Sequence, residues 1–313
     1  MVSRGIRRVS LDHYESNQDL ANLTARIASD YAPAIFIDPC AGFGSIFHHL
    51  PEPKRAFDIQ VRFPECKQQD FLESVRPCCN NTTICVVMNP PFSMKKQRNG
   101  VVAFLNHASN ILRSGEVCIS VAPQTMRRWN NISRVKADMH LEKEFVIHKA
   151  CPFRCDNGKS VDVSIVIQIW RKYSDRTRSQ PEFLRCHADF RVQCSLTDQR
   201  PVFFIKVWGV TKNIGKTSSL LLEDSKCADS LKCAVGTIRK KGGTAYCVYG
   251  DELVRTKIEK MYARGDFVKY CDKTSAGINN PFISASELYS IYEFGVEYYA
   301  KKRWNIEVVH LMN

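Results

Sequence analysis

The segment Asn89-Pro90-Pro91-Phe92 is the most informative for chemistry, because it follows directly on the apolar run Ile84–Met88. The two prolines fix φ and remove two backbone N–H donors, so the turn offers only hydrogen-bond acceptors at this point. The acceptors are the Asn89 side-chain oxygen and the Pro90 carbonyl, and two acceptors suit a planar NH₂ group. The Phe92 ring supplies a flat face on which a ring bearing that amine can stack.

A second group of candidate residues lies in the segment from Asp38 to Gly44, which follows another apolar run. Glycines after a strand let a ligand approach the backbone where no Cβ intervenes. Asp58 ends the next apolar run, at the position where an open nucleotide-binding sheet places an acid on ribose hydroxyls. The third glycine of the dinucleotide fingerprint is missing, with His48 near its place, and this argues against NAD.

These residues must be positioned by strands that end on one edge of a sheet. Four short runs are apolar on both faces, which is typical of central parallel strands: residues 34–38, 55–58, 84–89 and 116–123. Between the last two, apolar residues at helical spacing predict a helix over 101–112. Alternation over 161–169, with a candidate strand at 144–148 just upstream, predicts a terminal antiparallel pair. We therefore predict an α/β fold with a Rossmann-like sheet, mostly parallel, whose last strand is antiparallel.

Taken in order over about residues 13–170, these motifs resemble class I S-adenosylmethionine-dependent amino-methyltransferases with an Asn-Pro-Pro-Phe motif. The resemblance is particularly to γ-class DNA adenine-N6 methyltransferases. It implies S-adenosylmethionine as the cofactor. Asn89, Pro90, Pro91 and Phe92 match the catalytic tetrapeptide, and Phe153 lies where this family supplies a second aromatic against the extruded base.

The resemblance also implies which residues contact the cofactor. Tyr14 and Ser16 lie in a segment similar to the Tyr-x-Thr-Pro motif at the methionine end, although Asn17 replaces the usual proline. Asp70 and Phe71 are similar to an Asp-Phe pair that receives the adenine amine and flanks its ring. The expected cofactor-binding residues are Tyr14, Ser16, Asp38, Cys40, Gly42, Gly44, Asp58, Ile59, Asp70, Phe71 and Asn89.

Charge indicates a polyanionic partner. The 313 residues carry a formal charge of +13, and residues 171–313 alone hold 24 basic against 16 acidic side chains. A polar stretch at 171–181 predicts a domain boundary near 175. We expect a methyltransferase domain over 1–174 and a basic α+β target-recognition domain over 175–313, which contacts nucleic acid through Lys212, Lys216, Arg239, Lys240 and Lys241.

Cysteine spacing and hydropathy set further expectations. Fourteen cysteines occur without any C-x-x-C pair, which favours reduced apolar fillers over metal ligands. No metal is therefore expected. Neither an N-terminal apolar segment nor an apolar run of about 20 residues is present. We expect an intracellular protein, in the cytoplasm or nucleus, that is not secreted and has no membrane partner.

The function we predict is methyl transfer from S-adenosylmethionine to adenine N6 in DNA, with base flipping. The same tetrapeptide serves methylation of adenine or guanine amines in RNA and of glutamine amide in proteins, so an RNA amino-methyltransferase is one alternative. A non-catalytic nucleic-acid-binding protein that retains the fold is another. Charge favours nucleic acid over a small neutral protein, and DNA is our first choice over RNA. The sequence leaves a homodimer open.

Overall fold

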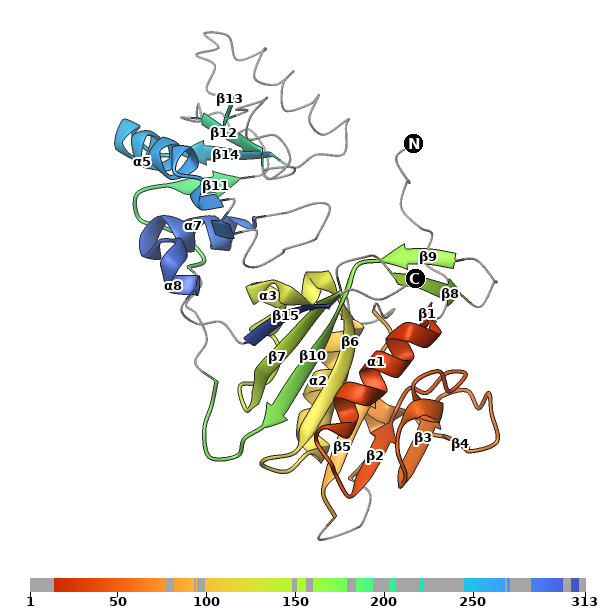
Figure 1. Cartoon of the computed structure of the whole chain (residues 1–313). Coiled ribbons are helices and arrows are strands. Elements are labelled where there is room, and N and C mark those ends of the chain that lie inside the picture. The colour runs from red at the N-terminus through yellow and green to blue at the C-terminus, as the bar shows by residue number, and fades with distance from the viewer. Residues whose placement is uncertain are drawn as a thin grey trace. The chain divides into compact units, whose positions relative to one another are not determined.

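The chain divides into two compact units, residues 1–180 with 304–313, and residues 181–303. The computed structural model in Figure 1 describes residues 14–76, 82–92, 94, 99–147, 151–155, 160–178, 184–193, 203–206, 220–221, 245–267, 269–270, 283–300 and 305–309. The division lies a few residues beyond the boundary predicted near 175. Residues 304–313 differ from the prediction, since they belong to the first unit through a strand that joins its sheet.

An eight-stranded sheet forms the framework of the first unit, in the order β15-β7-β10-β6-β5-β2-β3-β4. Its strands are β2 (Ile35–Asp38), β3 (Lys54–Asp58), β4 (Cys66–Gln68), β5 (Ile84–Met88), β6 (Val117–Pro123), β7 (Met139–Ile147), β10 (Ile165–Lys172) and β15 (Asn305–Val309). Neighbouring strands from β4 to β6 are parallel, and β15 is parallel to β7. Only β10 opposes its neighbours β6 and β7 in this sheet as described. The predicted α/β fold, with a mostly parallel Rossmann-like sheet that contains an antiparallel strand, is confirmed.

Helices cover both faces of this sheet. Helix α1 (Gln18–Ser29) begins at its N-cap Asn17, and α2 (Gly100–Ile111) begins at its N-cap Asn99. Figure 1 shows α1 in front of the sheet and α2 behind it. The apolar face of α1 packs on alternate residues of the central strands, such as Val87, Ile119 and Ile167. Every residue of β2 and β5 is buried, which explains why these strands are apolar on both faces.

The alternating run over 161–169 forms two strands rather than one. Strand β9 (Ser160–Val163) ends before Ser164, whose carbonyl accepts the N–H of Gln124, and β10 begins at Ile165. Strand β9 pairs with β8 (Cys151–Cys155), and β8 pairs with β1 (Tyr14–Glu15), all antiparallel. This small sheet brings the N-terminal segment beside residue 153.

Short helices complete the first unit: η1 (Phe47–His49), η2 (Phe71–Glu73), η3 (Gln124–Arg127) and α3 (Trp129–Ile132). In the described residues no helix has the length and apolar character that crossing a bilayer requires.

The second unit combines an antiparallel sheet with helices. Its strands are β11 (Arg191–Gln193), β12 (Phe203–Lys206), β13 (Leu220–Leu221) and β14 (Ala245–Tyr249), in the order β11-β14-β12-β13. The described helices are α5 (Glu252–Ala263), α7 (Ala285–Phe294) and α8 (Val296–Ala300). Helix α7 begins with a capping box, in which Ser284 and Glu287 exchange hydrogen bonds. Tyr289 and Tyr292 on α7 are buried, so they belong to the core of this unit.

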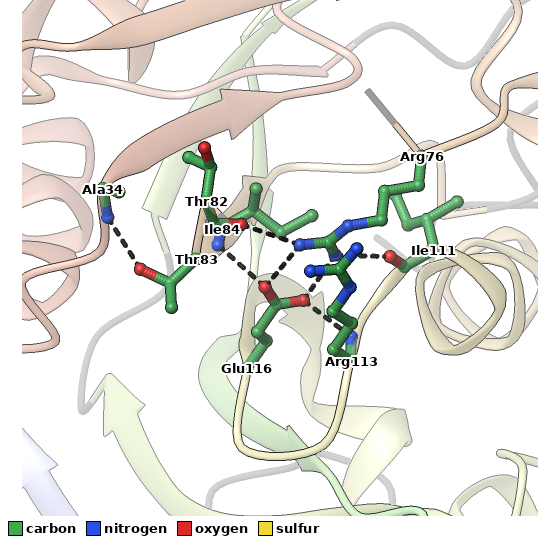
Figure 2. Close-up of polar contacts among 8 residues, drawn as sticks. All are labelled: Ala34, Arg76, Thr82, Thr83, Ile84, Ile111, Arg113 and Glu116. Atoms are coloured by element: carbon green, nitrogen blue, oxygen red, sulfur yellow. Dashed lines mark hydrogen bonds and ion pairs between the residues drawn. The ribbon is translucent and has the colours of Figure 1, made fainter. Parts of the chain in front are cut away.

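A buried ion pair fixes the amino-terminal edge of the first sheet (Figure 2). The Arg76 guanidinium donates to both carboxylate oxygens of Glu116 over 2.6 and 2.7 Å. The same carboxylate accepts the backbone N–H groups of Ile84 and Arg113, and Arg76 also donates to the carbonyl of Ile111. One side-chain pair therefore holds the starts of β5 and β6 and the end of α2.

Replacing Glu116 with glutamine should lower the free energy of unfolding by about 3 kcal/mol, because it leaves the Arg76 charge without its partner in a mostly buried site. Urea unfolding of the two proteins measures the change. Glu52→Gln is the matched control, since Glu52 pairs with Lys54 while 74% exposed, and it should alter stability by less than about 1 kcal/mol. Equal losses in both variants would contradict a special role for the buried pair.

Candidate functional site

The polar residues predicted from the sequence meet at the carboxyl-terminal edge of the sheet. Strand β2 lies between β3 and β5 and is parallel to both. Asp38 ends β2, Asp58 ends β3, and Asn89 follows directly after β5. Because parallel strands end on the same edge, three residues spread over 51 positions of sequence become neighbours in the fold.

The loop after β2 depends on its glycines. Gly42 and Gly44 have φ of +54° and +85°, a region in which other residues are strained. A Cβ at Gly44 would also lie 2.5 Å from Nε2 of His48. The Asp58 carboxylate accepts the N–H of Gly42 over 2.8 Å and that of Gln60 over 2.9 Å. This acid therefore shapes the glycine loop, a role that its strand-end position alone did not predict.

Asp38 is almost completely buried, at 2% exposure, beside the same loop. Its carboxylate accepts the N–H of Cys40 over 3.3 Å. Burial raises the pKa of Asp38 to about 8, the Cys40 N–H opposes that rise, and repulsion from Asp58 adds to it. The carboxyl group is consequently poised to lose its proton when a positive charge approaches.

Cys40 links the glycine loop to the segment after β5. Burial, followed by repulsion from Asp38 and Asp58, raises the pKa of its thiol well above the usual value, while the backbone N–H of Asn89 opposes that rise as a hydrogen-bond donor. The thiol is thus kept neutral, and Cys40 lies against the candidate catalytic turn.

Three exposed apolar side chains lie in or near the glycine loop. Phe43, Ile59 and Val61 are 46%, 47% and 52% exposed, although large apolar side chains usually avoid water. The Arg62 guanidinium lies over the Phe43 ring at 4.7 Å. This group and Asp58 together offer apolar surface beside a carboxylate.

Asp70 and Phe71, which are expected from the sequence at the adenine end of a cofactor, make contacts within the protein in this structure. Asp70 is exposed, and its carboxylate caps η2 by accepting the N–H of Leu72. Phe71 is only 4% exposed and packs against Phe104 and His107 of α2. Its ring therefore contributes to the core, and its predicted cofactor contact stays a prediction.

The N-terminal segment contacts the candidate catalytic turn at Asn89–Phe92. Nδ2 of Asn89 donates to Oγ of Ser16 over 3.1 Å, which joins residues 73 positions apart. The adjacent Glu15 carboxylate accepts the hydroxyl of Ser45, just beyond the glycine loop. Tyr14 lies in β1, but its side chain is outside the described residues. Ser16 thus lies beside Asn89, and its expected contact with the cofactor stays a prediction.

The Asn89–Phe92 turn packs between two other segments. The Phe92 ring meets the Phe153 ring edge-on, with centroids 5.9 Å apart. Phe153 is fully buried in the core that the apolar face of α1 forms with the sheet. On the other side, the N–H of Gly100 donates to the carbonyl of Phe92. A Cβ at Gly100 would lie only 2.0 Å from the Pro91 carbonyl oxygen. Pro90 is buried within the turn.

Asn99 and Gly100 were missed in the sequence. Their signal was an Asn-Gly pair just before an apolar helical run, the arrangement of an N-cap and the first helical residue. Nothing in that local pattern indicates that the helix start supports Pro91, because the contact crosses from one loop to another.

The five basic residues predicted to contact nucleic acid, Lys212, Lys216, Arg239, Lys240 and Lys241, lie outside the described residues. Within the described ranges, no group of three or more His, Cys, Asp or Glu side chains is arranged to hold a metal ion.

Comparisons with known proteins find distant structural resemblance to methyltransferases. No family model matches the sequence, and no curated protein matches it. Among solved structures, a candidate RNA methyltransferase from Pyrococcus horikoshii is 14% identical, with 54% of this chain and 90% of that chain covered and a TM-score of 0.41. A candidate class I S-adenosylmethionine-dependent methyltransferase from Listeria monocytogenes is 11% identical, with 56% and 66% covered and a TM-score of 0.41.

A third similar structure is a modification subunit of a candidate type I restriction enzyme from Vibrio vulnificus. It is 10% identical, with 60% of this chain and 48% of that chain covered and a TM-score of 0.39. At such identities and scores the likeness is one of distant architecture.

Raising the pH from about 4 to about 8 should lower the free energy of unfolding through Asp38. In this window the folded chain keeps a proton that the unfolded chain, with a pKa of 3.8, has released. The slope from this group is at most about 1.4 kcal/mol per pH unit. Chemical denaturation of the wild type and of Asp38→Asn across a pH series measures the difference. Identical slopes in the two proteins would rule out this linkage.

Proposed function

We propose that the first unit transfers a methyl group from S-adenosylmethionine to an exocyclic amine of a nucleic-acid base, and that adenine N6 in DNA is the substrate. The observation that carries the proposal is the meeting of Asn89 with Ser16 and with the loop of Asp38 at one edge of the sheet. Two motifs that are far apart in sequence, and that would serve the two substrates of one reaction, therefore lie in contact.

The residues around the glycine loop fit the proposed cofactor. Positive φ at Gly42 and Gly44 leaves the loop backbone open to a close ligand. Exposed Phe43 and Ile59 offer apolar surface for an adenine ring, and the Asp58 carboxylate can accept hydrogen bonds from ribose hydroxyls. Bound there, the cofactor would supply an electrophilic methyl on a sulfonium, so the protein needs no nucleophilic residue.

The turn at 89–92 would hold and align the target amine. The amide nitrogen of Asn89 donates to Ser16, and this bond fixes the orientation of the side chain, with the oxygen as its acceptor end. That oxygen and the Pro90 carbonyl would accept hydrogen bonds from the amine and keep electron density on its nitrogen. Alignment of the two reactants by fixed groups is a large source of catalysis.

The aromatic side chains would hold the ring that bears the amine. Phe92 is half-buried, and Phe153 supports it edge-on from the core. A base in a duplex cannot reach such a turn without leaving the stack, at a cost of about a few kcal/mol that stacking on Phe92 partly offsets. In this arrangement Phe153 acts by supporting Phe92.

The nature of the nucleic acid is tested directly with labelled cofactor and matched DNA and RNA oligonucleotides. We expect transfer to adenine in DNA, with a steep decrease in binding as salt is raised, because a chain of charge +13 would release counterions from phosphates. Transfer confined to RNA would overturn the choice of DNA while keeping the enzyme. Absence of both transfer and cofactor binding would favour a non-catalytic nucleic-acid-binding protein.

Replacing Asn89 with alanine should reduce kcat at least about 1,000-fold while cofactor affinity changes little, because the group that aligns the amine is lost. Asp58→Ala should instead weaken cofactor binding about 10-fold or more, since it removes the carboxylate that holds the loop at Gly42. Single-turnover kinetics and calorimetry separate the two effects. Asn106→Ala is the control, because the Asn106 side chain bonds to Arg134 and Lys136 rather than to the site. Equal losses of affinity in both variants would show that the roles are misassigned.

Cofactor binding near pH 7 should release a proton from Asp38. Its pKa of about 8 leaves the carboxyl protonated, and a nearby cation stabilises the ionised form. Calorimetry in two buffers of different ionisation enthalpy measures the released proton. Asp38→Asn should bind without that component, and a wild type whose binding enthalpy is independent of buffer would contradict the linkage.

A further inference from the structure

The start of α2 supports the catalytic turn directly. The carbonyl oxygen of Pro91 lies where any Cβ at position 100 would meet it at 2.0 Å, so only glycine fits there. The N–H of Gly100 also donates to the Phe92 carbonyl over 3.4 Å. Because the two segments touch this closely, a displacement of the first turn of α2 displaces the Pro91–Phe92 backbone.

One amide side chain connects that helix start to another segment. Oδ1 of Asn99 accepts the N–H of Val102 and so caps α2, while its Nδ2 donates to the sulfur of Met126 over 3.2 Å. Met126 lies on η3 and is fully buried. A thioether is a weak acceptor, but Met126 is fully buried and the contact is partly buried, which limits competition from water for the donor.

The segment η3 is itself fixed by a buried ion pair. Nε of Arg127, the residue after Met126, donates to the Glu144 carboxylate over 2.7 Å. The other oxygen of Glu144 accepts Nε2 of Gln168, which lies opposite it across β7 and β10. None of these three side chains is more than 1% exposed. Breaking such a buried pair is strongly unfavourable, so η3 is a rigid point of attachment.

We propose that Asn99 and Met126 are positioning residues for methyl transfer. Their side-chain contact ties the start of α2 to the rigid η3, and Gly100 passes that constraint to the Asn89–Phe92 turn. The inference rests on the proposed function, since it assigns the contact to the alignment of the target amine. A misplacement of about 1 Å at a reacting centre can cost about 100-fold in rate, so a contact remote from the amine can still control turnover.

Two conservative variants remove the contact from either side. Asn99→Asp keeps an oxygen that caps α2 but replaces the donor NH₂ by a second acceptor. Met126→Leu keeps the apolar volume and removes the sulfur. Asn106→Asp is the matched control on the same helix: its Nδ2 donates to the Arg134 carbonyl and its Oδ1 accepts the N–H of Lys136, away from the turn.

Three measurements are made on the full chain: kcat and KM for the preferred oligonucleotide, the cofactor dissociation constant, and hydrogen exchange at the Gly100 amide. We expect kcat to fall about 10-fold in each variant, with KM and cofactor affinity within about 2-fold. The double variant should be no worse than the more affected single one, because both remove the same contact. Exchange at Gly100 should accelerate in Met126→Leu, and Asn106→Asp should match the wild type.

Unchanged kcat and unchanged exchange in the two variants would overturn the inference, as would an equal loss in Asn106→Asp. The exchange measurement needs no turnover, which separates this inference from the proposed function. A wild type that methylates no oligonucleotide would refute the proposed function, and with it the catalytic role of the contact. Faster exchange in Met126→Leu would then still establish the contact as a structural one.

Discussion

The Glu116 carboxylate is the constraint on which the placement of the site depends. Its two oxygens accept the Arg76 guanidinium and the backbone N–H groups of Ile84 and Arg113, and a buried charge so engaged resists any shift of its partners. Strand β5 begins at this edge with Ile84 and ends at Met88, directly before Asn89. Such a strand is about 17 Å of stiff backbone, so fixing its start also locates the Asn89–Phe92 turn.

Helix α2 also connects the Arg76–Glu116 ion pair to the segment 89–92. Its carboxyl-terminal carbonyl, that of Ile111, accepts Arg76, while its first residue, Gly100, supports Pro91. The segment 89–92 is therefore positioned both by β5, which it follows, and by α2, which it contacts. The Arg76–Glu116 ion pair binds the far end of each of these two elements. At the same carboxyl-terminal edge, beside the segment 89–92, the buried carboxyl groups of Asp38 and Asp58 face one glycine loop, which suits a ligand that carries positive charge and hydroxyl groups.

Much of the fold was predictable because its signals are local. The runs that are apolar on both strand faces and the helical period over 101–112 correspond to strands and a helix in the structure. The strand ends placed Asp38, Asp58 and Asn89 on one edge, and parallel pairing brings them together.

What could not be predicted depends on contacts between distant segments. In the sequence, nothing distinguishes Phe71 and Phe153 from exposed stacking residues. In the structure both are buried, Phe71 against Phe104 and Phe153 in the core between α1 and the sheet. The hydrogen bonds of Asp58 to loop N–H groups and the support of Pro91 by Gly100 arise only when the chain is folded. Ser164, polar within an alternating run, gave no sign that the run divides into two strands.

The return of β15 to the first sheet changes how the chain must be divided. Residues 181–303 are an insertion, since the chain leaves the first unit near 180 and re-enters it at 304. A fragment that stops at 180 would lack the strand that covers β7 and would expose a nine-residue edge to pairing with other molecules. The inserted unit is accordingly tethered at both ends, so a single backbone cleavage within it would leave each half covalently attached to the first unit.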